Sequence, residues 1–569
     1  MKMKKILLAA AFIAATVSAG AQTMSDAINF SQNQYYGTAR SMALGNAMTA
    51  LGGDLGSIGI NPAGSAVVPY GQFVITPGVT ISAVNSAYSP EGEKAYGMTS
   101  RRVRGRMNLP NIGATVNFET GNRYGLKTIS FGFVSNQTNN YNFASEAFGN
   151  NSRTSKLAEL ADAARGYNES ILKEYSSFSN SLVPWDLLAA YQGGMYGSYG
   201  WEGEYAGFTE AISPDGDYHY VPGALAQSAF VNKFGSKNDV IINLGMNYSD
   251  RFYIGFNIGI PSARYRYNET FYESAVNPAD FKFVDDEGYE ACFLSGTAGY
   301  QYLAEMAGIY AKVGFIFRPV DGLRLGASFQ TPTAYTITES WSYSAATTFD
   351  DNYYTGSAAS PQGQYSYLLR SPYRASFGAA FTFGKKGLIS VDYELADYSV
   401  MRFSEIRDRN RAADSFLEKN WANRYFCGVE HNVRLGAELR VTPELTLRAG
   451  YSMQTSPERW WTSSDGQPVT ADDFFDDYNS FMNHVKNLVT PHYYLDRTRS
   501  YSVGIGYSSP GSFFMDAAVR ATSYPSTTFA PYYDYDSYDS FGNLNLVEAP
   551  RILNNRVLWN AAVTFGWRF

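Results

Sequence analysis

The sequence predicts an all-β protein, a fourteen-stranded antiparallel transmembrane β-barrel with an N-terminal hatch inside it and long extracellular loops. Three observations lead to this prediction. The chain begins with a segment typical of export, apolar and polar residues then alternate along many short segments, and short and long connections between those segments also alternate. Strict alternation is the pattern of a strand with one apolar and one polar face.

The first 21 residues have the organisation of a secretion signal peptide. Three lysines within residues 2–5 are followed by an apolar run over 6–17 and by a small-residue cleavage site at 19–21. Without these lysines the 45 basic residues fall to 42, against 52 acidic ones, and the formal net charge becomes −10. An acidic chain disfavours a nucleic-acid partner, because phosphate binding depends on Lys and Arg.

The composition of the remaining chain leaves two classes of protein. No run of 18 or more apolar residues follows the signal peptide, so no transmembrane helix is expected. Aromatic residues make up 16% of the chain, with 45 Tyr and 37 Phe. A secreted chain of this kind is either a soluble all-β protein or an outer-membrane barrel. Only helices and closed barrels satisfy every backbone hydrogen bond in lipid, so the strand pattern decides.

A stretch rich in small residues, 45–64, precedes the first alternating segment. It is too flexible to fold alone, because glycine loses much conformational freedom on folding, and too apolar to be a solvated tail. We therefore expect residues 22–70 to form a hatch packed inside a barrel whose wall is residues 71–569.

The wall strands are recognised by their period of two residues. Along 323–330, four apolar residues alternate with Arg324, Gly326, Ser328 and Gln330. A polar face this rich in small residues is expected for a crowded barrel interior. The expected strands lie near 72–86, 109–119, 125–137, 240–249, 251–266, 306–318, 322–336, 372–384, 387–401, 431–442, 444–455, 499–508, 512–522 and 555–569.

The connections support the same barrel. Six short turns interleave with seven long loops, which places both chain ends on the short-turn side, as in outer-membrane barrels. The longest loop, 138–239, has a helical apolar pattern and is expected to hold an amphipathic helix pair over the barrel mouth. The last strand ends at Phe569, which looks like the signal read by outer-membrane assembly machinery; a soluble edge strand is the alternative.

Several motifs resemble the FadL family of outer-membrane channels for hydrophobic compounds, and the likeness spans nearly the whole mature chain. The motifs are Asn61-Pro62-Ala63-Gly64 at the end of the hatch and the tracts 317–329, 391–399 and 434–452. The resemblance implies a barrel in the outer membrane of a Gram-negative bacterium, which takes up long-chain fatty acids or other apolar molecules passively. Ligands would be captured among the outer loops, pass the hatch and leave through a wall gap near the third strand.

The resemblance also sets the expected partners and site residues. Asn61, Pro62, Ala63 and Gly64 carry over as hatch residues, and no cofactor and no metal ion is implied. The expected partners are hydrophobic small molecules, outer-membrane lipids and the barrel-assembly machinery. Gly132 interrupts the third strand and is a candidate wall kink; the alternative is an ordinary small lumen residue.

Four arginines are predicted to face the lumen, and a fatty acid needs a cation at one end of an apolar pocket. The alternative is that they serve structure alone by pairing with the hatch and with lumen-facing carboxylates. The candidate carboxylate contacts are Arg324, Arg374, Arg434 and Arg448, and the alternative partners are Asp392, Glu394 and Glu438.

Other functions are weighed against this one. The scattered histidines suggest no Ser-His-Asp arrangement, so an enzyme is not expected. A surface receptor or adhesin, binding haem or a host ligand through Tyr-rich loops, is the alternative function, and a water-filled porin is a third. Whether Cys292 and Cys427 form a disulfide is left open by the sequence.

Overall fold

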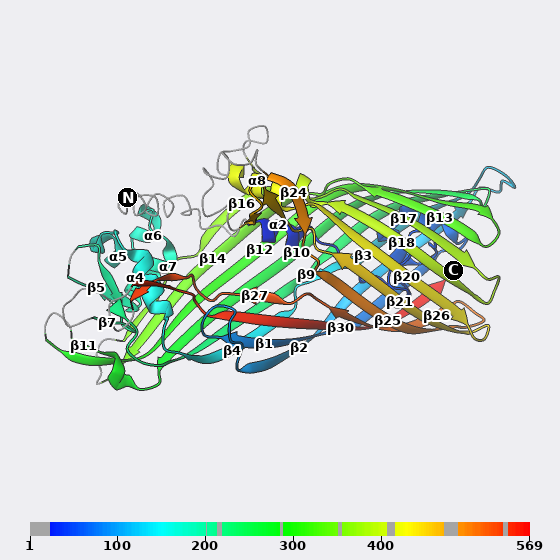
Figure 1. Ribbon diagram of the computed structural model, residues 1–569. Helices are drawn as coiled ribbons and strands as arrows, with labels where there is room; N and C mark the ends of the chain where they lie inside the picture. Colours follow the sequence, from blue (N-terminus) through cyan, green and yellow to red (C-terminus); the bar gives the residue numbers. More distant parts are fainter. Residues whose placement is uncertain are drawn as a thin grey trace.

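The computed structural model describes residues 23–200, 202–212, 219–284, 288–350, 355–406, 416–471, 488–538 and 544–569. The expected signal peptide, residues 1–21, lies outside the described residues. Within them the main sheet is a long closed barrel, with short turns at one end and larger loops at the other (Figure 1).

Fourteen antiparallel strands form the barrel, which confirms the predicted fold class. Strand β30 closes the ring by pairing with β1 from Gln72↔Arg568 to Ser89↔Arg551. In ring order the strands are β1 (Gln72–Ser89), β2 (Thr99–Glu119), β3 (Leu126–Asn140) continued by β4 (Phe143–Asn151), β9 (Leu225–Tyr248), β10 (Phe252–Ala275), β12 (Glu290–Val320), β13 (Leu323–Gln330) continued by β14 (Ala334–Phe349), β16 (Gly363–Arg370) continued by β17 (Arg374–Thr382), β18 (Gly387–Asp397) continued by β19 (Arg402–Glu405), β20 (Val429–Arg440), β21 (Leu445–Thr455), β25 (Arg497–Ser508), β26 (Phe513–Ser523) continued by β27 (Thr527–Phe529), and β30 (Arg551–Arg568).

The remaining elements lie in the hatch and in the long loops. The hatch contains α2 (Met24–Ser31), α3 (Ala39–Ala43), η1 (Leu55–Gly59) and η2 (Pro62–Val67). The loops contain α4 (Lys156–Ala164), α5 (Glu169–Lys173), α6 (Ser177–Asn180), α7 (Trp185–Gln192), α8 (Leu417–Phe426), η3 (Pro278–Phe281), η4 (Tyr398–Val400), β5 (Tyr196–Ser198), β6 (Tyr205–Gly207), β7 (Ala211–Ile212), β8 (His219–Tyr220), β11 (Lys282–Val284), β15 (Gly356–Ala359), β22 (Arg459–Ser463), β23 (Pro468–Val469), β24 (Leu488–Tyr493), β28 (Tyr535–Tyr538) and β29 (Leu544–Val547).

The outward faces of the strands locate the bilayer. Along β10 the outward residues are apolar from Phe252 to Ile260 and become polar at Ser262 and Arg264. Large apolar side chains remain exposed below this boundary, among them Phe133 at 60% and Ile242 at 52%. A closed barrel with an exposed apolar belt is the form that crosses an outer membrane. Among the helices of the described residues, none is long and apolar enough to cross a bilayer.

Several strands extend further at the loop end than the alternation predicted. Strand β9 begins at Leu225 instead of near 240, and β12 begins at Glu290 instead of near 306. Beyond the membrane boundary the ladder between β9 and β10 continues without a break, and the ladder between β10 and β12 resumes in the same register after Ile260 and Pro261. Above that boundary the outward residues face water, so the apolar half of the sequence pattern ends although the strand does not.

In the described part of the longest loop the helical segment consists of four short helices, α4 to α7, instead of the expected pair. Helix α4 follows the helical apolar spacing, but Gly166 (φ +86°) and Pro184 interrupt the segment after it. The helices pack on the inner face of the extended sheet, where Leu157 and Leu188 join one apolar cluster with Phe293. This cluster holds the helices over the barrel mouth.

The first of these helices is fixed to the wall by Glu273 of β10, which is fully buried. Its carboxylate accepts hydrogen bonds from Ser155 Oγ (2.5 Å), Leu157 N (3.1 Å) and Gln227 Nε2 (2.9 Å). Burial raises the pKa of Glu273 above its ordinary value, although these hydrogen bonds act in the opposite direction.

The packing of α4 is therefore expected to depend on pH. The carboxyl takes up a proton in the folded loop at a higher pH than in the unfolded loop, so the loop gains stability as the pH falls through the raised pKa. Above that pKa both forms are ionised and the gain is lost. Hydrogen exchange of the α4 amides, corrected for the intrinsic rate, should slow from pH 8 to pH 5. The same change in Glu273→Gln would contradict this assignment.

Candidate functional site

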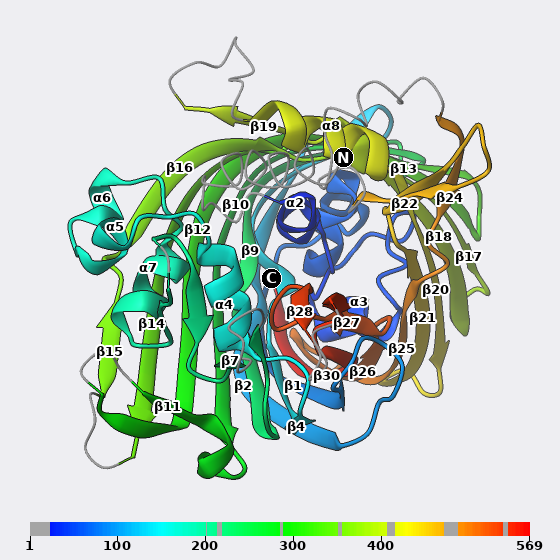
Figure 2. The same ribbon diagram turned by 60° about the vertical axis from the view of Figure 1, so that its left-hand side comes forward.

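The hatch runs through the inside of the barrel, and Figure 2 shows α2 and α3 within the ring of strands. Helix α2 begins with a capping box, in which Thr23 Oγ1 accepts from Asp26 N (3.1 Å) and Asp26 Oδ2 accepts from Thr23 N (3.2 Å). Helix α3 lies against the last wall strands, where Ala39 N donates to Thr564 Oγ1 (2.8 Å).

The hatch backbone packs directly against glycines on the lumen face of the wall. A Cβ placed on Gly255 would lie 2.3 Å from the carbonyl carbon of Pro62, and one on Gly326 would lie 2.2 Å from Thr49 O. Gly450 of β21 would meet the backbone of Gly45 in the same way. The glycine-rich inner face seen in the sequence is therefore a docking surface, because only residues without a Cβ allow this approach.

The four predicted hatch residues lie at the centre of this docking. Asn61 is the N-cap of η2 and accepts from Ala63 N (3.1 Å), while its Nδ2 donates to Thr49 O (2.6 Å) and to Phe315 O of the wall (3.0 Å). Their other links are Asn243 Nδ2 to Pro62 O (3.0 Å) and Gly53 N to Gly64 O (2.8 Å). These contacts fasten the hatch; a role of the four residues in passage stays a prediction.

Two of the predicted carboxylate contacts, Arg374 and Arg434, share one buried partner. Arg434 Nη2 lies 2.7 Å and Arg374 Nη1 3.2 Å from the carboxylate of Glu394, and Arg374 also lies 3.5 Å from Glu430. The side chains of all four residues are 2% exposed. Arg374 additionally donates to Ser31 O of the hatch (2.8 Å). Both arginines thus hold the hatch and the wall together.

The other two candidates are engaged as well. Arg448 pairs with Glu438 (2.7 Å) and Asp516 (2.5 Å), and Arg324 Nη1 donates to Leu51 O of the hatch (2.7 Å). The four arginines therefore have protein partners, as the structural alternative expects. Asp392 differs from that alternative, because it accepts from Thr49 N (2.7 Å) of the hatch.

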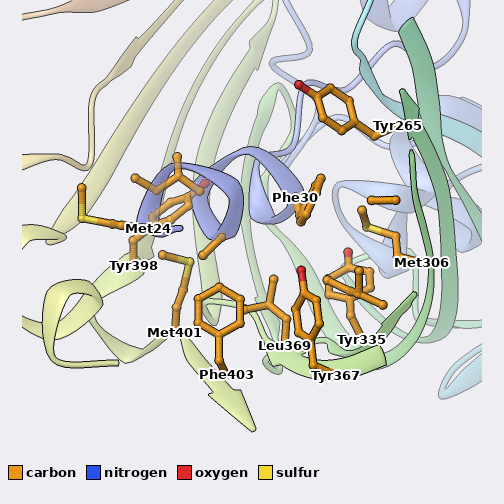
Figure 3. Close-up of a cluster of buried hydrophobic side chains, with 14 of the residues drawn as sticks. Met24, Phe30, Tyr265, Met306, Tyr335, Tyr367, Leu369, Tyr398, Met401 and Phe403 are labelled. Carbon is orange, nitrogen blue, oxygen red and sulfur yellow. The ribbon is translucent and has the colours of Figure 1, made fainter. Parts of the chain in front are cut away.

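A cluster of aromatic side chains surrounds α2 near the outer boundary of the bilayer. Figure 3 shows Met24 and Phe30 of α2 facing side chains from several wall strands. The wall residues labelled there are Tyr265, Met306, Tyr335, Tyr367, Leu369, Tyr398, Met401 and Phe403. All are buried, and we call this set the aromatic chamber. The sequence signal for it is Tyr at alternate positions, as at 300 and 302 or 365 and 367.

A cavity, which we call the outer pocket, lies between the loop helices and the strands that also carry the aromatic chamber. It has a volume of ≈ 200 Å³ and a mixed lining, with Leu160 of α4, Ala190 of α7, and Ala298 and Tyr300 of β12 beside the charged Lys156, Asp186 and Glu269. Tyr300 also packs against the aromatic chamber. The outer pocket and the packed aromatic chamber are therefore in contact through one side chain.

The wall is interrupted beside the aromatic chamber, at the third strand. Strand β2 pairs with β1 along most of its length. On its other side, within the described strands, β2 pairs with β3 only through its residues Asn111 to Glu119. The hatch binds the part of β3 that β2 leaves unpaired, where Gln34 N donates to Thr138 O (2.7 Å) and Tyr36 N to Gln137 O (3.1 Å). Tyr141, between β3 and β4, lies edge-on to Tyr265 at 5.0 Å, so it reaches into the chamber.

The interruption lies beyond Gly132, the candidate wall kink. Gly132 is paired on both sides, with Thr115 of β2 and Asn243 of β9. The register of β3 against β9 shifts near the start of the strand, between Leu126 and Thr128, and again between Gln137 and Asn139, so Gly132 itself lies in a regular stretch. The sequence did hold a signal for the interruption, since residues 135–142 read Ser-Asn-Gln-Thr-Asn-Asn-Tyr-Asn and lack the apolar alternation of a wall strand.

The remaining chemical candidates lie apart from this route. Cys292 and Cys427 are not joined by a disulfide, and Cys427 is buried. His431 Nδ1 lies 2.6 Å from Tyr393 Oη, and His492 stacks on Trp460 with ring centroids 4.2 Å apart. Within the described ranges no group of three or more His, Cys, Asp or Glu residues could hold a metal ion. His484 lies outside those ranges.

The fold and the site define a fourteen-stranded outer-membrane barrel filled by an N-terminal hatch. No protein-family model and no curated protein matches the chain. Among solved structures, a FadL homologue of Pseudomonas aeruginosa matches with a TM-score of 0.47 and 11% identity, over 94% of this chain and 99% of the other.

Two toluene transporters are also similar. TodX of Pseudomonas putida matches with a TM-score of 0.46 and 12% identity, over 94% of this chain and 99% of that one. TbuX of Ralstonia pickettii matches with a TM-score of 0.42 and 12% identity, over 94% and 98%.

Proposed function

We propose that this barrel is a passive channel through which hydrophobic molecules, long-chain fatty acids in particular, enter across the outer membrane. One observation carries the proposal: aromatic side chains connect the outer pocket, the chamber around α2 and the interrupted third strand. Tyr300 lines the outer pocket and packs against the aromatic chamber, and Tyr141 reaches from the interruption to the chamber residue Tyr265.

The chemistry of this route suits an apolar chain. Each methylene group moved from water into such a space contributes about 0.8 kcal/mol, so the outer pocket can capture a dilute ligand. The apolar side of α2, with Met24 and Phe30, occupies the chamber below it. For a ligand to pass, some contacts between α2 and the chamber residues must therefore be replaced by contacts with the ligand.

The exit at the third strand follows from the backbone. The edge of β3 is covered by hatch residues Gln34 and Tyr36 and not by β2. A hatch that shifts would uncover this edge, and the exposed side chains beside it include the apolar Met107 at 81% and Phe133 at 60%, together with Arg106. A ligand leaving here meets membrane lipid, and no step needs an energy source.

The test is uptake of palmitate into proteoliposomes that contain the full barrel. Ala298→Phe fills the outer pocket and should lower the uptake rate roughly tenfold, the loss of about two methylenes of burial at ~0.8 kcal/mol each. Ala311→Phe is the matched control, because Ala311 lies on the same strand and faces the lipid. Equal rates for both variants would contradict the proposed route.

Binding and transport must be measured separately. If palmitate binds the purified protein but crosses no faster with the barrel than without it, the protein is a surface receptor that uses its Tyr-rich loops. If a steady ion current flows through the wild-type barrel, it is a water-filled porin.

A further inference from the structure

We propose that a small inorganic anion, of about the size of chloride, binds in a polar cavity between the hatch and the wall. The cavity has a volume of ≈ 30 Å³ and lies between hatch residues 33–35 and 45–46 and strands β20, β21, β25 and β26. Its lining contains Arg434 and Arg520 but no carboxylate. The proposal is independent of which molecule the channel carries.

Arg520 of β26 is the cation that requires a partner. Its side chain is 5% exposed, Nη1 donates to Tyr35 O (2.9 Å), and the guanidinium lies 4.6 Å from the ring centroid of Tyr36. Among the described residues no carboxylate lies within ion-pair distance of it, and its Nε has no hydrogen-bond partner. A buried charge of this kind is strongly unfavourable without a counter-charge.

A second donor belongs to the same cavity. Arg434 Nη2 is held by Glu394 at 2.7 Å, but Nη1 has no partner. Two guanidinium N–H groups on residues lining one small space form charge-assisted hydrogen bonds best with an anion. The Asn432 amide can add an N–H if it is turned, because its oxygen and nitrogen are assigned only by their partners.

The size of the cavity selects the class of anion. One probe sphere of water size occupies about 10–15 Å³, so this space takes a single halide ion with a water molecule, and no fatty-acid chain. The water is needed because Asn46 Oδ1, also without a partner, must receive a hydrogen bond. An organic carboxylate with a long tail does not fit.

The anion would strengthen the seat of the hatch. Tyr35 O receives both Arg520 Nη1 (2.9 Å) and Asn46 Nδ2 (2.7 Å), so the backbone of the hatch is clamped at the edge of this cavity. A bound anion would neutralise Arg520 and so remove the unfavourable free energy of burying its charge. This charge is buried only while the hatch is docked. The hatch should therefore be held more firmly in halide than in a salt of a large anion.

The experiment measures protease protection of the hatch in the detergent-solubilised full barrel, while sodium chloride replaces sodium gluconate at constant ionic strength. Wild-type protein should show a saturable gain in protection, and Arg520→Gln should lose it. Arg499→Gln, which removes an exposed arginine on β25, should keep the gain. A gain that persists in Arg520→Gln would overturn the proposal.

Bromide provides a readout that does not depend on the folding of a variant. Crystals of wild-type protein soaked in sodium bromide should give an anomalous peak within hydrogen-bond distance of Arg520 Nε and Arg434 Nη1. Ordered water alone at this place, together with no halide effect on the hatch, would refute the site. So would protection by palmitate in place of chloride, since the cavity would then belong to the transported ligand.

Discussion

Replacing Gly255 by alanine is expected to unseat the hatch and to open the barrel to ions. The added Cβ would lie 2.3 Å from the carbonyl carbon and 2.4 Å from the carbonyl oxygen of Pro62. These are backbone atoms of a docked segment, so the hatch must move away or the wall must deform. Overpacking of this kind costs about 1–3 kcal/mol, which raises the unseated fraction roughly tenfold to a hundredfold.

Single-channel recording in planar bilayers checks this expectation. Open events should be frequent for Gly255→Ala and rare for the wild type, and the hatch of the variant should be cut faster by protease. Gly105→Ala is the control, because Gly105 is also on a wall strand and a Cβ there meets no atom within 4 Å. Identical conductance in both variants would mean that the hatch does not depend on this close approach.

Replacing Glu394 by glutamine is expected to cause the largest loss of stability. The substitution removes the charge that Arg374 and Arg434 share, at 3.2 and 2.7 Å, while all three groups stay buried. Breaking a buried ion pair in this way costs about 3–5 kcal/mol, since it leaves uncompensated charge in a medium of low polarity. Tyr35 of the hatch also donates to this carboxylate (3.3 Å), so the hatch should loosen together with the wall.

Thermal unfolding in detergent and protease protection of the hatch measure the two effects. Glu305→Gln is the matched control, because Glu305 pairs with Arg264 at 3.1 Å on the outer surface, where both side chains are more than half exposed. Exposed pairs contribute about 0–1 kcal/mol, so this variant should melt close to the wild type. If the two variants melt alike, the buried network does not hold the barrel.

The wall was predictable because its pattern is local. Alternation within a strand, as along 323–330, can be recognised without knowing which strand is its neighbour. The short turns between such segments then give the number of strands. The hatch was predictable from 45–64 as an apolar, small-residue stretch that requires an enclosure. Its seats could not be located, because they join residues far apart in the chain, such as Pro62 and Gly255.

The functional features were harder for a related reason. The partners of Arg374 and Arg434 depend on the register between β17, β18 and β20, which the sequence specifies only through the finished sheet. The interruption after Gln137 was marked by a polar run, but without the neighbouring strands such a run also fits an ordinary loop. The loop helices were divided by glycine and proline at positions that an apolar count does not weigh.

The contact between Ala39 and Thr564 also bears on how the protein reaches its folded form. These two residues are separated by 525 positions, so this contact of the hatch can form only after β30, the last strand of the barrel in chain order, is in place. Contacts this distant in sequence form late, because the entropy lost in closing a long loop comes before the contacts that offset it. The nascent barrel therefore has to grow around a segment that is not yet docked. A chain lacking its final strand should keep its hatch accessible throughout assembly.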